Sequence, residues 1–156
     1  MGTSTRKISH IFLADDDEDD RTLFTEAVKV ISPDIKVTLA ENEPSLLIFL
    51  DSEVVPEVIF LDVNMPIRSG LDCLRAIKSN INYINSAVVM YSTSNNIKDI
   101  DAAYNEGADF YIIKPSNYTL LIDILRSLFN TLSSKRNFHS RESFLINEER
   151  NRYSTI

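Results

Sequence analysis

Residues 57–66 read EVIFLDVNMP, and the first part of this stretch, EVIFL, is an almost continuous apolar run. Short apolar runs of this kind are typical of strands that are buried on both faces of a parallel sheet. The run ends at Asp62, so a carboxylate directly follows the predicted strand. Because ligands bind beyond the carboxyl ends of the strands in open parallel sheets, Asp62 is a candidate for a functional site.

Four further apolar or β-branched runs surround this one, and segments with helical spacing lie between them. Phe24, Ala27, Val28 and Ile31, for example, fall on one helical stripe. Strand and helix alternate five times, which predicts an α/β fold: a doubly wound five-stranded parallel sheet with helices on both faces. The other predicted strands are 8–14, 35–40, 87–91 and 109–113.

Polar side chains follow four of the five predicted strands. Asp15 and Asp16 follow the first, Asp62 the third, Ser92 the fourth and Lys114 the fifth. All of these strand ends meet at one edge of a parallel sheet, so the side chains should converge there. Clustered carboxylates repel one another unless a cation lies among them, and an oxygen ligand set suits Mg²⁺ or Mn²⁺. The lysine and the hydroxyl beside that cation suit a phosphoryl group.

The six consecutive acidic residues 15–20 also allow a calcium-binding interpretation. Asp15, Asp17, Asp19 and Glu26 occupy positions 1, 3, 5 and 12 of an EF-hand loop. Position 6, however, is Asp20 and not the glycine that the turn requires, and a predicted strand precedes the loop. Asp19 and Asp20 have a simpler role in the first turn of a helix, whose amino end favours negative charge.

A phosphatase of the haloacid-dehalogenase type is a second alternative. Asp15-x-Asp17 after a strand, followed later by Ser92 and Lys114, fits that pattern loosely. The same class requires a late acidic pair, and Asp123 is the single acidic residue shortly after the lysine. A phosphatase would turn over external phosphomonoesters many times, whereas a signalling module would take up one phosphoryl group.

The composition excludes several other classes of protein. The formal net charge is −7, which argues against direct DNA binding, since that requires clustered lysine and arginine. Cys73 is the single cysteine, so no internal disulfide can form; we expect a small buried side chain on the third helix and a reducing compartment. No apolar run reaches membrane-span length. We therefore expect a cytoplasmic protein without a membrane partner.

A sequence motif after the third predicted strand resembles that of a known protein family. The stretch 59–66 (IFLDVNMP) is followed by Gly70, and Ser92 and Lys114-Pro115 come later at fixed intervals. Together with the acid pair after the first strand, these residues resemble the receiver domain of two-component response regulators. The resemblance implies the flavodoxin-like strand order 2-1-3-4-5. It also implies a cis peptide bond before the proline.

The resemblance implies a metal site. Asp16 and Asp62 would give carboxylate ligands to Mg²⁺, with Mn²⁺ possible, the backbone carbonyl of Asn64 would be a third ligand, and Asp15 would act through water. Three consecutive aspartates leave the register open, because the pair after the strand is either Asp15 and Asp16 or Asp16 and Asp17. The end of the apolar run at residue 14 favours the first pair.

The resemblance also implies roles in phosphoryl transfer. Asp62 would be the phosphoacceptor, and Lys114 would pair first with its carboxylate and then with a phosphoryl oxygen. Ser92 and the backbone N–H of Thr93 would donate to other phosphoryl oxygens. Tyr111 resembles an aromatic switch that turns inward as Ser92 moves; the alternative is an edge-strand tyrosine half in solvent.

The domain organisation follows from the length of the match. The receiver-like part covers residues 8–132, and residues 133–156 form a C-terminal extension too short for an output domain. We expect no enzyme beyond Mg-dependent self-phosphorylation and self-dephosphorylation. The expected partners are a histidine kinase or phosphotransfer protein and a downstream protein. The extension carries apolar anchors, Phe138 and 144–146, and should pack over the last helix or join a homodimer or partner contact.

Overall fold

The computed structural model describes residues 7–65, 68–134 and 139–148, and it contains one six-stranded parallel sheet. The strand order is β2-β1-β3-β4-β5-β6, so the predicted order 2-1-3-4-5 is confirmed and a sixth strand is added. The strands are β1 (His10–Ala14), β2 (Lys36–Ala40), β3 (Val58–Leu61), β4 (Ala87–Ser92), β5 (Phe110–Ile113) and β6 (Leu145–Ile146). The helices are α1 (Glu18–Ile31), α2 (Glu43–Leu50), α3 (Gly70–Lys78), the 3₁₀ turn η1 (Ile81–Tyr83), α4 (Ile97–Asn105), α5 (Tyr118–Ser134) and α6 (Arg141–Phe144).

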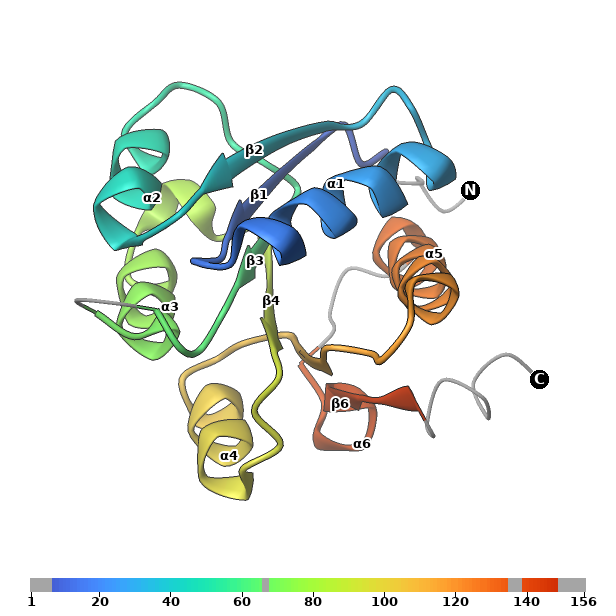
Figure 1. The fold of residues 1–156 in the computed structure, drawn as a ribbon. Helices are drawn as coiled ribbons and strands as arrows, with labels where there is room; N and C mark the ends of the chain where they lie inside the picture. Colours follow the sequence, from blue (N-terminus) through green and yellow to red (C-terminus); the bar gives the residue numbers. More distant parts are fainter. Residues whose placement is uncertain (1–6, 66–67, 135–138, 149–156) are drawn as a thin grey trace, which may run out of the picture.

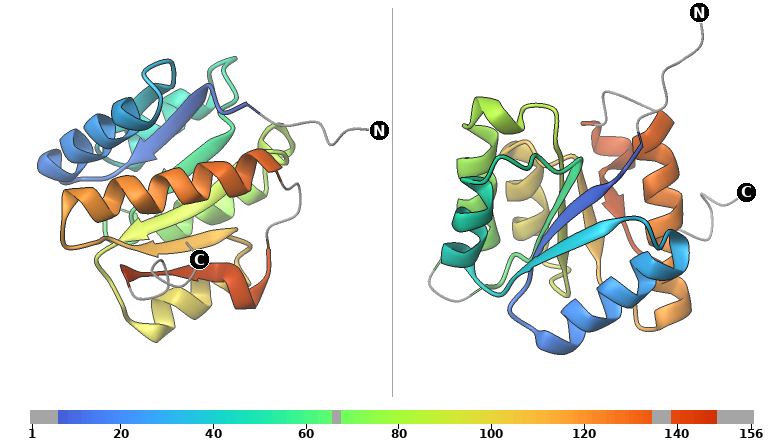
Figure 2. Two further views of the ribbon diagram at one scale, coloured as in Figure 1. Left: turned by 90° about the vertical axis from the view of Figure 1, so that its right-hand side faces the viewer. Right: turned by 90° about the horizontal axis from the view of Figure 1, so that it is seen from above.

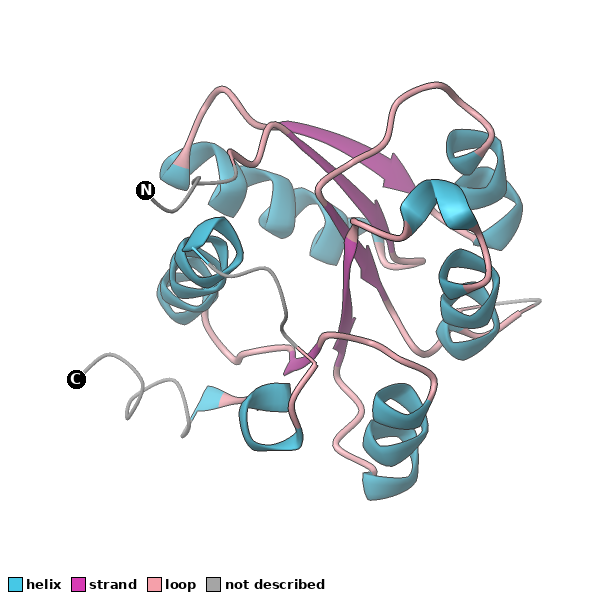
Figure 3. Cartoon of the chain, turned by 180° about the vertical axis from the view of Figure 1, so that it is seen from behind, coloured by secondary structure: helices cyan, strands magenta, loops and turns pink. Residues whose placement is uncertain are grey.

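Helices cover both faces of the sheet, as Figures 1 and 2 show. Helices α1 and α5 pack on one face, and α2, α3 and α4 cover the other; Figure 3 shows the same arrangement with the molecule seen from behind. Side chains of the central strands alternate between the two sides: Ile11 and Leu13 belong to the first core cluster, and Phe12 and Ala14 to the second. This two-sided burial explains the nearly continuous apolar runs of the central strands.

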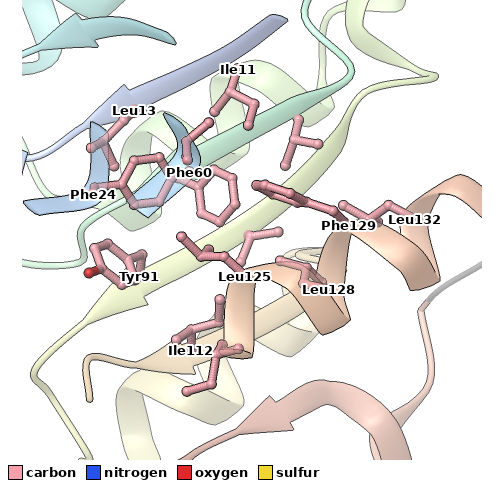
Figure 4. Close-up of a cluster of buried hydrophobic side chains, with 14 of the residues drawn as sticks. Ile11, Leu13, Phe24, Phe60, Tyr91, Ile112, Leu125, Leu128, Phe129 and Leu132 are labelled. Carbon is pink, nitrogen blue, oxygen red and sulfur yellow. The ribbon is translucent and has the colours of Figure 1, made fainter. Parts of the chain in front are cut away.

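The first core cluster lies between the sheet and helices α1 and α5 (Figure 4). Phe24 of α1 makes edge-to-face contacts with Phe60 of β3 and Tyr91 of β4, with ring centroids 4.8 and 5.5 Å apart. Such aromatic pairs stabilise a core beyond the area they bury. They fix α1, and with it the loop after β1, against the middle of the sheet.

Short polar side chains start the helices. Asp17, Asn42, Ser69 and Asn96 each accept a hydrogen bond from a backbone N–H in the first turn of α1, α2, α3 and α4. These residues satisfy donors that would otherwise lack partners. After α4, Gly107 has a φ of 97°, the left-handed conformation with which glycine commonly ends a helix.

The C-terminal extension adds a strand to the sheet. Leu145 pairs with Tyr111, and Ile146 pairs with Ile112, in parallel register. The side chain of Phe144, just before the strand, is fully buried in the second core cluster. Residues 145–146 thus lie along β5, whereas the predicted positions of the extension were over the last helix or in a homodimer or partner contact. The open edge of β5 explains the difference, since it offers unpaired backbone groups that β6 satisfies.

Aromatic and charged contacts hold the same segment against α4. The ring of His139 stacks on Tyr104 at 4.2 Å, and Arg141 pairs with Asp101 and lies over the same tyrosine ring. Phe144 meets Tyr104 edge to face. The predicted anchors 144–146 are therefore confirmed as packing residues, Phe138 lies outside the described residues, and the homodimer stays a prediction.

Two further features bear on the expected class of protein. In the described parts of the chain, no helix is both long enough and apolar enough to cross a membrane. Cys73 is buried on α3, as predicted, and burial raises the pKa of its thiol to about 11. It is therefore a packing residue and not a reactive thiolate.

Candidate functional site

The structure brings three acidic residues together where β1 and β3 end. One carboxylate oxygen from each of Asp15, Asp16 and Asp62 lies within 4.8 Å of the other two. Asp15 and Asp62 are buried, whereas Asp16 is exposed at the mouth of the site. The three oxygens form a donor set of the kind that hard divalent cations prefer.

Asp17 caps helix α1, and this favours Asp15 and Asp16 over Asp16 and Asp17 as the acid pair of the site. Its side chain accepts a hydrogen bond from the backbone N–H of Asp20, 2.9 Å away, and caps α1. The acid run also does not form an EF-hand, because a strand precedes it and residues 18–31, including Glu26, form one helix. The grouped oxygens come from Asp15 and Asp16.

Lys114, at the end of β5, extends its ammonium into this acid group. Its Nζ lies 2.7 Å from Oδ2 of Asp20, 2.8 Å from Oδ2 of Asp15 and 3.2 Å from Oδ2 of Asp62. It also lies 5.2 Å from the centre of the Tyr91 ring. Burial alone would lower the pKa of Lys114, but the surrounding carboxylates raise it above its usual range, so the ammonium stays charged.

Asp15 is the most deeply buried of the three carboxylates. Its side chain is fully buried, and Oδ2 lies 2.8 Å from Nζ of Lys114 in an ion pair without good hydrogen-bond geometry. Burial raises the pKa of Asp15 to about 6, against the opposing effect of the lysine. A buried carboxylate that is poorly hydrogen-bonded destabilises the protein, and a cation in the acid group would stabilise it. The three carboxylates therefore fit a divalent cation.

The burial of this carboxylate predicts that Asp15→Asn changes the free energy of unfolding in a pH-dependent way when no metal is bound. In wild type the folded state keeps the Asp15 proton up to about pH 6, while the unfolded state loses it near the model value of 3.8. Stability from this group is therefore present below about pH 4 and is lost as the pH rises toward 6. At pH 7.5 in a chelator, urea unfolding should find the variant more stable by about 1–3 kcal/mol.

The exposed neighbour gives the matched control for this prediction. Asp16→Asn removes the same charge one residue away and should change stability much less. At pH 4 the advantage of Asp15→Asn should also nearly disappear, since Asp15 is then largely protonated in the folded state. An advantage of the same size at both pH values would show that the buried charge is not its cause.

The remaining predicted residues lie just after β3 and at the end of β4. The backbone N–H of Asn64 donates to Oδ1 of Asp62 at 3.1 Å. Ser92 is fully buried at the end of β4, its Oγ accepts from the N–H of Ser94 at 3.2 Å, and Thr93 is exposed beside it. The metal contact predicted for the Asn64 carbonyl and the phosphoryl contacts of Ser92 and Thr93 stay predictions.

Tyr111 points into the protein. Its side chain is fully buried, and its hydroxyl donates to the backbone carbonyl of Ser94 at 2.9 Å. The alternative of an edge-strand tyrosine half in solvent is wrong, because β6 covers the edge of β5 and Phe144 packs near the ring. The implied cis bond before Pro115 is also wrong, since the described residues contain no cis peptide. Trans is the ordinary form even before proline.

Sequence reasoning missed two members of this site. Asp20 was assigned to the first turn of α1, where it does lie, but its carboxylate also contacts Lys114. Tyr91 was assigned to a strand, and its ring lies against the same ammonium. No sequence signal reports either contact, because residues 20 and 114 meet only through the packing of α1 against the sheet.

Comparison with known proteins agrees with this geometry. The family model described as the response regulator receiver domain matches residues 11–126. The chain belongs to this family. Two-component response regulator ORR13 of Oryza sativa subsp. japonica is 31% identical over 106 residues, covering 68% of this chain and 86% of that protein. Response regulator Rcp1 of Synechocystis is 27% identical over 124 residues, covering 76% and 84%.

Solved receiver structures are similar in fold. The phosphorylated cyanobacterial phytochrome response regulator RcpA matches with a TM-score of 0.76 and 27% identity, covering 86% of this chain and all of that one. The Mn²⁺-bound form of response regulator Rcp1 matches with a TM-score of 0.72 and 25% identity, covering 85% and 99%. The chain is a two-component receiver domain, and neither the calcium-binding nor the phosphatase alternative is supported.

Proposed function

We propose that this receiver domain takes up one phosphoryl group on Asp62 from a phosphohistidine of a histidine kinase or phosphotransfer protein. The reaction requires Mg²⁺, or Mn²⁺ in its place, and the protein then signals by contact with a downstream protein. The observation that carries the proposal is the ammonium of Lys114 lying 3.2 Å from Oδ2 of Asp62, inside a group of three carboxylates that fits a cation.

The residues of the chain would divide the reaction as follows. An oxygen of Asp62 attacks phosphorus, an O–P bond forms, the P–N bond breaks, and the released imidazole takes a proton from solvent. Lys114 moves its contact from the carboxylate to a phosphoryl oxygen, and Ser92 and the N–H of Thr93 donate to the others. Asp15, Asp16 and Asp62 would hold the cation, whose charge reduces the repulsion between the anionic nucleophile and the phosphoryl group.

Two structural relatives support these roles. RcpA was solved in a phosphorylated form, and Rcp1 was solved with Mn²⁺ bound. Both are similar to this chain over most of its length, so the same chemistry at the corresponding strand ends is the simplest proposal. Because the phosphoryl group stays on the protein, turnover is limited to slow self-dephosphorylation.

The proposal is tested by incubating the full chain with Mg²⁺ and acetyl phosphate and measuring its intact mass. Wild type should gain the mass of a single phosphoryl group, and the gain should disappear on treatment with hydroxylamine, which cleaves acyl phosphates. Asp62→Asn should gain nothing, because an amide is not a nucleophile for phosphorus. Adding a chelator should abolish the gain in wild type.

Asp123→Asn is the matched control, since it makes the same chemical change on the exposed surface of α5. It should be phosphorylated as wild type is. An adduct that persists in Asp62→Asn would place the phosphoacceptor elsewhere. Repeated turnover of a phosphomonoester would instead identify a phosphatase.

A further inference from the structure

The ammonium of Lys114 is shared among three carboxylates, and one of them stands apart. Asp15 and Asp62 belong to the group of three that fits a cation, whereas Asp20 does not. Asp20 nevertheless makes the shortest contact, 2.7 Å from its Oδ2 to Nζ of Lys114, with hydrogen-bond geometry. The lysine side chain is only 7% exposed, so these carboxylates replace most of its contact with water.

Binding of a cation creates a conflict at two of these three contacts. A divalent cation and the ammonium would both draw on the carboxylates of Asp15 and Asp62, and the two positive charges repel each other at short range. An ammonium that loses its anionic partners while buried carries a large desolvation penalty. Of its three anionic partners, only Asp20 is left free by the cation.

We propose that Asp20 is a positioning residue that retains Lys114 in the site when a divalent cation takes over Asp15 and Asp62. This inference rests on the proposed function, because it assumes the cation. Asp20 allows both positive charges to occupy one pocket: the cation lies among the three grouped carboxylates, and the ammonium stays at the edge next to α1. Lys114 thereby remains close to Asp62, where a phosphoryl oxygen would arrive.

The local structure holds Asp20 in place for this role. It lies in the first turn of α1, and its backbone N–H donates to Oδ1 of Asp17 at 2.9 Å. The ring of Tyr91 lies 5.2 Å from the ammonium and limits its movement further. The next residue toward the amino end, Asp19, is exposed and shares the same turn, so it offers the same charge without the described contact.

The test compares Mn²⁺ affinity, measured by titration calorimetry and by the electron paramagnetic resonance signal of free Mn²⁺, in full-length Asp20→Asn and Asp19→Asn. Both variants lose one negative charge near the cation, so both should bind somewhat more weakly than wild type. Without Asp20, the lysine must compete with the cation for Asp15 and Asp62. Asp20→Asn should therefore bind Mn²⁺ about five-fold more weakly than Asp19→Asn.

The same two substitutions in a Lys114→Met protein test whether the difference in Mn²⁺ affinity arises from the lysine. In Lys114→Met no ammonium competes for the carboxylates, so Asp20→Asn and Asp19→Asn should there lower affinity equally. Asp20→Glu, which keeps a carboxylate at this position, should restore most of the wild-type affinity. Equal affinities of Asp20→Asn and Asp19→Asn in the native background, or an unequal pair in Lys114→Met, would overturn the inference.

The same titrations separate this inference from the proposed function. If wild type binds Mn²⁺ and takes up a phosphoryl group while the two asparagine variants behave alike, only the role of Asp20 is wrong. If wild type binds no divalent cation, the metal-dependent part of the proposed function is wrong, and the inference is overturned with it. Thermal unfolding in a chelator should confirm that all variants are folded.

Discussion

Phe144→Ala is expected to lower the free energy of unfolding by about 3–5 kcal/mol, the range for removing a fully buried aromatic ring. The ring has no exposed surface and contacts Tyr104 edge to face, with ring centroids 5.2 Å apart. It also lies 6.3 Å from the ring of Tyr111. The cavity would open beneath β6, so we expect the sixth strand to detach from β5 in the variant.

Urea unfolding and amide hydrogen exchange measure the two parts of this result. Amides of 145–146 and of the adjoining edge of β5 should lose protection in Phe144→Ala. Phe49→Ala is the control: it removes the same ring from a half-buried position on α2 and should lower the free energy of unfolding by only about 1–2 kcal/mol. A loss below about 1 kcal/mol in Phe144→Ala would show that the extension does not contribute to the folded sheet.

Gly70→Ala is expected to damage both stability and phosphoryl uptake. A Cβ on residue 70 would overlap the carbonyl oxygen of Asp62 and would lie 2.8 Å from its carbonyl carbon and 3.0 Å from Cα of Val63. These are backbone atoms of the segment that carries the phosphoacceptor, and the N–H of Gly70 also donates to the Val63 carbonyl at 2.9 Å. We expect a loss of about 3 kcal/mol or more in stability, because this overlap cannot be relieved by a rotamer change.

The same substitution should slow phosphorylation of Asp62 by about a hundred-fold, since relief of the overlap must displace its backbone by a good fraction of an ångström. Acetyl phosphate kinetics followed by intact mass provide the measurement. Gly107→Ala is the matched control: the atoms nearest to its Cβ would be those of the flexible Lys78 side chain, 3.7 Å away. Its positive φ should cost about 1–2 kcal/mol and leave the phosphorylation rate unchanged. Equal effects of the two alanines would contradict the steric explanation.

The central part of the fold was predictable because each signal was local. The apolar runs predicted β1, β3, β4 and β5 to within a residue or two, and the carboxylates and the lysine that follow β1, β3 and β5 lie together as predicted. The reason is geometric: parallel strands place all of their carboxyl ends on one edge, so residues far apart in sequence become neighbours without further information.

The contacts that complete the site could not be predicted in this way. The pairing of Asp20 with Lys114 depends on the angle at which α1 packs on the sheet, and the ring of Tyr91 takes part through the same packing. The burial of Asp15, which leaves one of its oxygens poorly hydrogen-bonded, is likewise a tertiary property. Each of these features depends on how elements pack, and residue types in a sequence do not record packing angles.

Residue patterns were enough to predict the alternation of strand and helix and the family. They also predicted the sheet edge that carries Asp16, Asp62, Ser92 and Lys114. The position of residues 139–148 against β5 and α4 could be found only from the tertiary structure. The two-residue strand β6 is too short to be recognised from propensity, and it forms because β5 offers an unpaired edge and a pocket for Phe144. Local patterns encode local structure, whereas a docked segment is specified by the surface that receives it.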